Sequence, residues 1–270
     1  LGLTWRDEIG KDFSYDLGLN LSAVRNKAIK FSGDGPMNVG GFNSDQIIRN
    51  EDGGLISRFY GYVADGLFQN MEEVYAHTDE HGTQIQPNAK PGDIRFKNLC
   101  NDDLLDDKDL TMIGNPNPDW VYGFSLNIDW KNIDFSVFFQ GVAGVDRIVM
   151  DYPTVSGNVT TAFLDRYSES ANPNGNFPRL GNGDYNSQPS SFWLKDASYL
   201  RLKNIELGYS FKQEWIRKAK LERLRIYVSA QNILTITGID DYDPEKYGTD
   251  TRGHAYPNAK TFSVGLNITL

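Results

Sequence analysis

The sequence predicts an all-β protein, in particular the strands of an antiparallel β-barrel that crosses a membrane and carries long loops. Three observations predict this class: apolar and polar residues alternate over long segments, aromatic residues mark both ends of an apolar face, and the links are either very short or very long. The mean hydropathy of −0.49 agrees with the class, because a strand with one apolar face averages as polar.

The clearest strand runs from Trp120 to Trp130. Its even-numbered residues are all apolar or aromatic, while its odd-numbered residues are mostly small or polar, which is the period of two of a β-strand. At about 3.3 Å per residue and a tilt of about 40°, the segment crosses roughly 25 Å, the height of a barrel's apolar band. A tryptophan at each end matches the two aromatic belts of such a barrel.

The same alternation recurs along the chain. It is found at 13–22, 133–139, 204–211, 224–231 and 262–270, and residues 1–5 have the character of the end of a strand already in progress. Weaker candidates at Val39–Arg49 and Leu55–Ala64 bring the total to about nine strands. Nine strands would leave two open edges, which hydrocarbon does not allow, so we expect the missing strands elsewhere in the same protein.

The links between these segments fall into two classes. Those at 6–12 and 130–133 are short, whereas two others reach about 50 residues, a length that compact soluble domains seldom tolerate. Short periplasmic turns and long extracellular loops are typical of a membrane barrel. A soluble antiparallel sheet gives the same alternation with its apolar face turned inward, so a soluble β-rich module remains an alternative.

Composition narrows the function classes. The 270 residues are 39% hydrophobic and 13% aromatic, which indicates a folded chain, and the net charge of −9 argues against a nucleic-acid binder. A single cysteine, Cys100, excludes an internal disulfide and a thiolate zinc cluster. The sequence contains no nucleophile elbow or other local catalytic motif, so we expect no enzyme activity.

The segment 98–109 has the length and acidity of a twelve-residue calcium loop. Cys100 stands in place of an oxygen ligand and Asp103 in place of the glycine of the sharp turn, so a solvated acidic loop is the alternative interpretation. No cofactor is otherwise required. The candidate calcium ligands are the side chains of Asn98, Asp102, Asp106 and Asp109 and the carbonyl of Leu104.

Two further groups of residues are weighed against plainer interpretations. His77 and His81 would share one face of a helix, but no third ligand is near and His254 is distant, which favours solvated loop histidines. Aromatic residues in the second long loop offer surfaces for sugar rings or for a partner, yet we expect them to form the loop's own core. They are Tyr152, Phe163, Tyr185, Phe192 and Trp193.

A series of short motifs follows in order along essentially the whole chain. They lie at 59–62 (FYGY), 65–68 (DGLF), 91–97 (PGDIRFK), 113–116 (IGNP), 118–120 (PDW), 138–141 (FFQG), 193–204 (WLKDASYLRLKN), 232–235 (NILT), 243–245 (DPE), 256–257 (YP) and 261–270. With these motifs the sequence resembles the C-terminal part of SusC/RagA-type TonB-dependent outer-membrane transporters of Bacteroidetes. Barrels of this kind often end in an aromatic residue, whereas this chain ends in Leu270.

The resemblance implies that residues 1–270 form the C-terminal portion of a barrel of about 22 strands, with the plug domain and the N-terminal strands outside this chain. It implies contact with lipid in the cell outer membrane and the import of oligosaccharides or peptides. It also implies two protein partners, a SusD-like surface lipoprotein and TonB, the latter acting through the missing N-terminal part.

Two other functions remain as alternatives at this stage. One is a soluble β-rich carbohydrate-binding module. The other, a β-sandwich glycoside hydrolase, would need a placed pair of carboxylates that the sequence does not single out. The substrate-binding residues and the substrate itself are not predicted.

Overall fold

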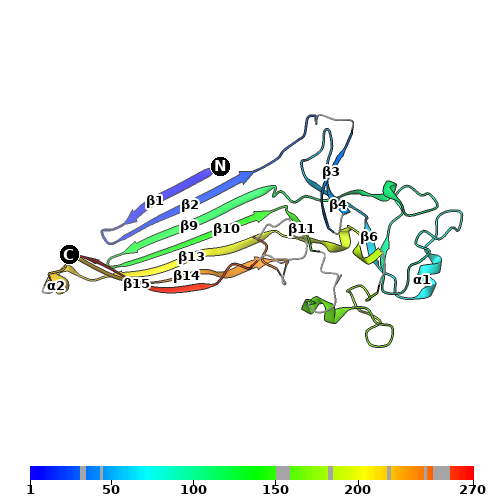
Figure 1. Ribbon diagram of the computed structural model, residues 1–270. Helices are drawn as coiled ribbons and strands as arrows, with labels where there is room; N and C mark the ends of the chain where they lie inside the picture. The colour runs from blue at the N-terminus through cyan, green and yellow to red at the C-terminus, as the bar shows by residue number, and fades with distance from the viewer. Residues whose placement is uncertain are drawn as a thin grey trace.

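A seven-stranded antiparallel sheet dominates the computed structural model, which describes residues 1–30, 35–42, 45–149, 159–181, 185–217, 220–239, 242–245 and 256–270. Each strand pairs with the next strand of the sheet along the chain, so the sheet is a simple meander (Figure 1). In spatial order the strands are β1 (Gly2–Ile9), β2 (Phe13–Ala23), β9 (Trp120–Trp130), β10 (Ile133–Ala143), β13 (Tyr199–Ser210), β14 (Arg223–Thr237) and β15 (Thr261–Thr269).

The pairing register sorts the side chains of the sheet into one apolar and one polar face. Residues that are paired across strands share a face, because side chains alternate along each strand. One row across the sheet reads Trp5, Leu17, Leu126, Val137, Ile205, Ala230 and Phe262. The neighbouring row on the opposite face reads Arg6, Asp16, Asn127, Ser136, Glu206, Ser229 and Ser263.

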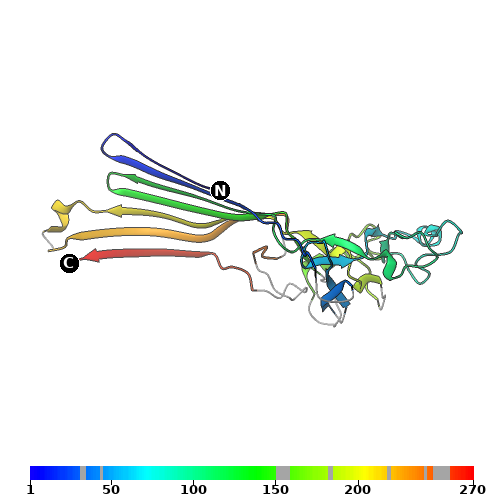
Figure 2. The same cartoon turned by 90° about the horizontal axis from the view of Figure 1, so that it is seen from above.

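Within the described part of the chain, no second layer covers the apolar face. The sheet extends as a single layer in both views (Figures 1 and 2), and Trp130, Leu207, Val228 and Phe262 are all exposed on it. A soluble sheet of this size would bury its apolar face against another layer. The arrangement is that of strands whose apolar side chains face lipid.

The two ends of the sheet carry different connections. The short turns 10–12, 131–132 and 211–222, the last with helix α2 (Gln213–Ile216), lie at one end. Gly10 and Lys131 adopt the positive φ angles, 71° and 57°, that tight hairpin turns require. Segments 24–119, 144–198 and 238–260 make the long connections, and their described residues gather at the opposite end (Figure 1).

The two weaker strand predictions were wrong as barrel strands. Val39–Arg49 overlaps two paired strands, β3 (Met37–Phe42) and β4 (Asp45–Asn50), and Leu55–Ala64 contains the short β5 (Arg58–Gly61). With β8 (Thr111–Gly114) they form a separate four-stranded sheet inside the first long connection. Strands of four to six residues span only about 13–20 Å, too little to cross the apolar band.

The long connections fold together into a loop assembly with its own core. Its remaining elements are β6 (Ala64–Leu67), α1 (Met71–Ala76), β7 (Ile94–Phe96), β11 (Asp146–Ile148), β12 (Leu194–Asp196) and the 3₁₀ helices Asp107–Asp109, Thr161–Asp165, Tyr185–Ser187 and Ser191–Trp193. The core draws Ile47, Phe59, Ile94 and Phe96 from the first connection and Ile148, Phe177 and Trp193 from the second. Among the residues described, none of the helices has the length and apolar character needed to span a membrane.

Candidate functional site

Near the turn end, the polar face carries an ion cluster that joins three neighbouring strands. Arg225 of β14 donates through Nε to Asp134 Oδ1 of β10 (2.9 Å) and through Nη2 to Glu206 Oε1 of β13 (2.6 Å). The guanidinium also lies 4.8 Å from the ring centroid of Tyr227. Gly208 pairs with Asp134 and Tyr227 across the sheet, and a Cβ at Gly208 would lie 2.4–2.6 Å from the charged atoms of Asp134 and Arg225. The glycine is therefore needed for the close approach of these charges.

A second ion cluster lies at the loop end of the same face. Arg201 of β13 donates to Asp243 Oδ1 (2.6 Å), to Glu245 Oε2 (2.5 Å) and to Thr235 Oγ1 (2.9 Å). Lys203 adds a contact of 2.8 Å with Glu245 Oε1. Asp243 and Glu245 belong to the connection between β14 and β15, so the cluster fixes this connection to the wall of the sheet.

The electrostatics of Asp243 follow from this geometry. Burial alone would raise the pKa of its carboxyl group. Hydrogen bonds from Arg201 and from the backbone N–H groups of Asn258 and Glu245 outweigh burial and lower the pKa. Asp243 is therefore a carboxylate at neutral pH and compensates the charge of Arg201.

A β-bulge brings Arg201 and Lys203 onto the polar face. The register between β13 and β14 shifts between Leu202 and Asn204, and Asn232 on the facing strand has φ of 55°. The alternation changes phase at the bulge. The odd-numbered residues of β13 are apolar from Ile205 to Tyr209, whereas on the other side of the bulge the odd-numbered residues Arg201 and Lys203 are charged.

The aromatic residues of the second long loop form its core, as predicted. Trp193 is buried, and its ring centroid lies 5.6 Å from that of Phe177 and 5.0 Å from that of Phe192. Phe163 and Tyr185 pack against the same core. Tyr152 lies outside the described residues.

A buried polar network joins the two long connections at the centre of the loop assembly. Asp93, fully buried, accepts from Arg179 Nη2 (3.1 Å) and from Asn186 Nδ2 (2.8 Å). Asn186 Oδ1 in turn accepts from the backbone N–H of Ile94 (2.9 Å). Fully buried Gln86 bonds the backbone of Ile94 and Phe96 on β7. Because each buried polar group has a partner, this network stabilises one arrangement of the connections.

The acidic loop is folded around its own carboxylates. Cys100, Asp102, Asp106 and Asp109 place one potential ligand atom each within 4.8 Å of one another, and this is the one such group among the described residues. Fully buried Asp109 accepts from the backbone N–H groups of Leu99 (2.7 Å) and Asp106 (3.1 Å). Cys100, not predicted as a ligand, thus joins three of the predicted residues.

Lys108 supplies a positive charge to the same loop. Its Nζ lies 2.6 Å from Asp102 Oδ2 and 3.3 Å from Asp106 Oδ2. Its hydrogen bond lowers the pKa of Asp102. Of the other predicted ligands, Asn98 donates to the carbonyl of Asp102 (2.6 Å), and Leu104 has an exposed side chain. The calcium site remains a prediction. The ammonium group of Lys108 lies among the carboxylates that would bind the ion.

The two histidines do not share a helix. Helix α1 ends at Ala76 and His77 is its C-cap, whereas His81 lies beyond it in an exposed turn. The His77 ring packs edge-on against Phe68 with centroids 5.4 Å apart, and burial lowers its pKa. His254 lies outside the described residues.

Comparisons with known proteins agree with this geometry. The chain is 28% identical to TonB-dependent receptor P3 of Formosa agariphila, over 97% of the chain and 27% of the relative. It is also 28% identical to TonB-dependent receptor SusC of Bacteroides thetaiotaomicron, over 96% of the chain and 25% of that relative. The chain is a homologue of SusC-type TonB-dependent receptors. It spans about a quarter of the length of these curated relatives, and no protein-family model matches it.

Solved structures show the same fold for this SusC homologue. It superposes on a structure of the RagAB peptide transporter with a TM-score of 0.70 and 20% identity, over 99% of this chain and 28% of that chain. A structure of the RagAB peptide importer in the open-open state gives a TM-score of 0.68 and 21% identity, over 100% of this chain and 28% of that chain. The predicted fold class is confirmed, although the seven strands described do not close a ring.

The comparisons also confirm that the chain does not come from an enzyme family, because the relatives are receptors and the structural neighbours are transporters. Sequence reasoning missed the two ion clusters and the buried network around Asp93. Two features of the sequence could have indicated them. Charged residues occupy polar-face positions of the strands, and Asp93, Asp243 and Glu245 lie in the Pro-Gly-Asp and Asp-Pro-Glu motifs.

Proposed function

We propose that this chain is part of an outer-membrane active transporter that imports oligosaccharides or peptides. It works with a SusD-like surface lipoprotein and is energised by TonB. The observation that carries the proposal is the two-faced sheet with an uncovered apolar face, short turns at one end and long loops at the other. In a membrane barrel the short turns are periplasmic and the long loops extracellular.

The polar face supports a role in a wet interior. It carries the ion clusters of Arg225 and Arg201, and charged side chains inside a barrel lie in the lumen because hydrocarbon would not solvate them. The loop assembly above it is large and has its own core, as expected of a surface that meets substrates and a lipoprotein partner.

The alternative, a soluble carbohydrate-binding module, is disfavoured by the same sheet. Such a module would need another layer over Leu126, Leu207, Val228 and their neighbours, and none covers them in the described part of the chain.

The test uses the full-length protein in its own cells. We expect it to remain in the outer-membrane fraction through salt and carbonate washes and to be released by detergent. Deleting its gene should abolish uptake of a specific oligosaccharide or peptide, and collapsing the proton gradient should stop uptake in the wild type. Release of the protein in buffer, or uptake that survives both treatments, would contradict the proposal.

A further inference from the structure

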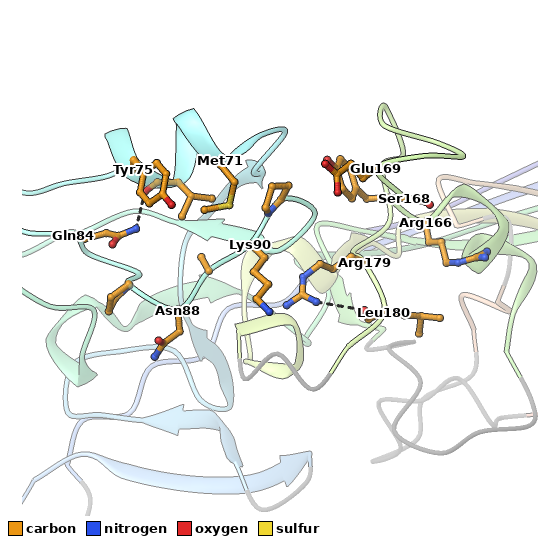
Figure 3. Close-up of a pocket in the computed structure, with 15 residues that line it drawn as sticks. Met71, Tyr75, Gln84, Asn88, Lys90, Arg166, Ser168, Glu169, Arg179 and Leu180 are labelled. Carbon is orange, nitrogen blue, oxygen red and sulfur yellow. Dashed lines mark hydrogen bonds between the residues drawn. The ribbon is translucent and has the colours of Figure 1, made fainter.

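A hollow of about 750 Å³ lies in the loop assembly beside α1, at the end of the molecule remote from the short turns (Figure 1). One wall comes from α1 and the segment that follows it, and the other from residues 166–169 and 179–180 (Figure 3). Its size is that of sites that hold small molecules or short oligomers. The residues that determine its chemistry are Met71, Tyr75, Lys90, Arg179 and Leu180.

Two cations meet in the lining of this hollow, Arg179 and the exposed Lys90. The backbone N–H of Lys90 and the Nη2 of Arg179 both donate to Asp93 Oδ2, at 2.9 and 3.1 Å, so the two residues share one anchor. The ends of their side chains point toward one another (Figure 3). Asp93 compensates one of the two positive charges. No carboxylate of the described residues is in ion-pair range of the Lys90 ammonium, which leaves one positive charge in excess.

The other charged groups of the hollow do not neutralise the excess positive charge at Lys90 and Arg179. Arg166 is turned away and lies 5.1 Å from the Phe163 ring centroid, with its Nη1 on the Phe163 carbonyl (3.4 Å). Glu169 is exposed on the far side of the hollow from Lys90 (Figure 3). The positive potential is therefore local to Lys90 and Arg179.

Apolar side chains are exposed around the same hollow. Tyr75 is 66% exposed, Leu180 51% and Met71 39%. An aromatic ring, a branched aliphatic chain and a thioether within one hollow provide an adaptable contact surface for an apolar group.

The walls are held in place by the core behind them. Val74 and Ala89 are buried against Phe68. The hydroxyl of Tyr167 donates to the carbonyl of Gln69 (3.0 Å) and ties the two walls together. A hollow that is formed before binding loses little conformational entropy on binding.

We propose that this hollow is a binding site for a carboxylate flanked by an apolar group, as at the C-terminus of a short peptide that ends in phenylalanine. The carboxylate bonds the Lys90 ammonium, and the apolar group packs against Tyr75, Met71 and Leu180. The site concerns binding alone and does not depend on TonB or on transport.

The test measures binding of Gly-Gly-Phe, its C-terminal amide and digalacturonate to the purified full-length protein in detergent, by calorimetry. We expect the free acid to bind about tenfold more tightly than the amide, because a charge-assisted hydrogen bond is lost. Lys90→Gln should remove this difference and Tyr75→Ala should weaken both peptides. Lys97, like Lys90, is an exposed lysine of the first connection, but it lies outside the hollow, so Lys97→Gln should change nothing.

Three results would overturn the proposal. Equal binding of the acid and the amide would remove the role of the carboxylate. Equal effects of Lys90→Gln and Lys97→Gln would show that binding depends on general charge. Tighter binding of digalacturonate than of Gly-Gly-Phe would show that the hollow takes an acidic sugar instead. Because no step requires transport, these results are independent of any failure of uptake.

Discussion

Arg201 of β13 and Asp243, which follows β14, form an ion pair of 2.6 Å in which each side chain is only 4% exposed. The pair joins the wall of the sheet to the segment between β14 and β15. Removing one partner of a buried pair leaves an uncompensated charge, which costs far more than the loss of a surface pair. This pair therefore fixes Asp243, at the start of the connection that leads to β15, to the wall of the sheet.

Arg201→Gln should release this connection. The buried carboxylate of Asp243 would lose its cation, whereas Glu245 would keep Lys203, and we expect the free energy of local opening to fall by about 3–5 kcal/mol. Limited proteolysis of the full-length protein would measure it as faster cleavage between β14 and β15. Arg223→Gln, at the exposed turn end of β14, is the matched control. Equal cleavage in the two variants would show that the ion pair does not hold the connection.

The same connection should open in acid. Asp243 has a pKa below its ordinary value of 3.8 in the folded state, so its stabilising contribution is complete above pH 3.8. The contribution is lost only as the pH falls through the lower folded-state value. Pepsin cleavage of 238–260 should therefore stay slow at pH 5 and rise below pH 3.8, with little pH response in Asp243→Asn. Opening near pH 6 would contradict the assignment.

Gly92→Ala should loosen the loop assembly. Gly92 has φ of 86°, and a Cβ there would lie 2.4 Å from the Tyr167 ring. The strained backbone and the displaced ring together should cost about 1–3 kcal/mol of local stability. Hydrogen exchange should report faster exchange at 90–96 and 165–179 without a change in the strands of the sheet. Gly82 also has a positive φ, but a Cβ there would meet no atom within 4 Å. Gly82→Ala therefore measures the backbone strain without the clash.

The acidic loop should bind calcium weakly because Lys108 already lies among its carboxylates. Interaction with Asp102 and Asp106 raises the pKa of Lys108, so the ammonium stays charged throughout the physiological range. Lys108→Ala should bind calcium several-fold more tightly than the wild type, as measured by calorimetry on the full-length protein. If neither protein takes up calcium at millimolar concentration, the loop is a solvated acidic loop.

The sequence predicted the longest strands well because their alternation is uninterrupted. The predicted Trp120–Trp130 matches β9 residue for residue. β13 was predicted only from residue 204 onward, because the bulge at Lys203–Asn204 changes the phase of the alternation and the apolar residues Leu200 and Leu202 no longer fit the period.

The loop assembly could be predicted only in part. The aromatic core was predicted because a long ordered loop needs buried apolar side chains. The Asp93–Arg179 contact joins residues from separate connections, and no local pattern encodes which charged residues will meet across them. The pairings of Arg201 with Asp243 and of Arg225 with Asp134 were missed for the same reason.

The orientation of the sheet in lipid is tested most directly by placing an arginine on each face of β9. Leu126→Arg puts the charge at mid-strand on the apolar face, and Asn127→Arg puts it one residue further along on the polar face, next to Asp16. Unfolding of the full-length protein from lipid bilayers in guanidinium should show a loss of about 2–4 kcal/mol for Leu126→Arg and less than about 1 kcal/mol for Asn127→Arg. Equal losses, or a larger loss for Asn127→Arg, would contradict a lipid-facing apolar side.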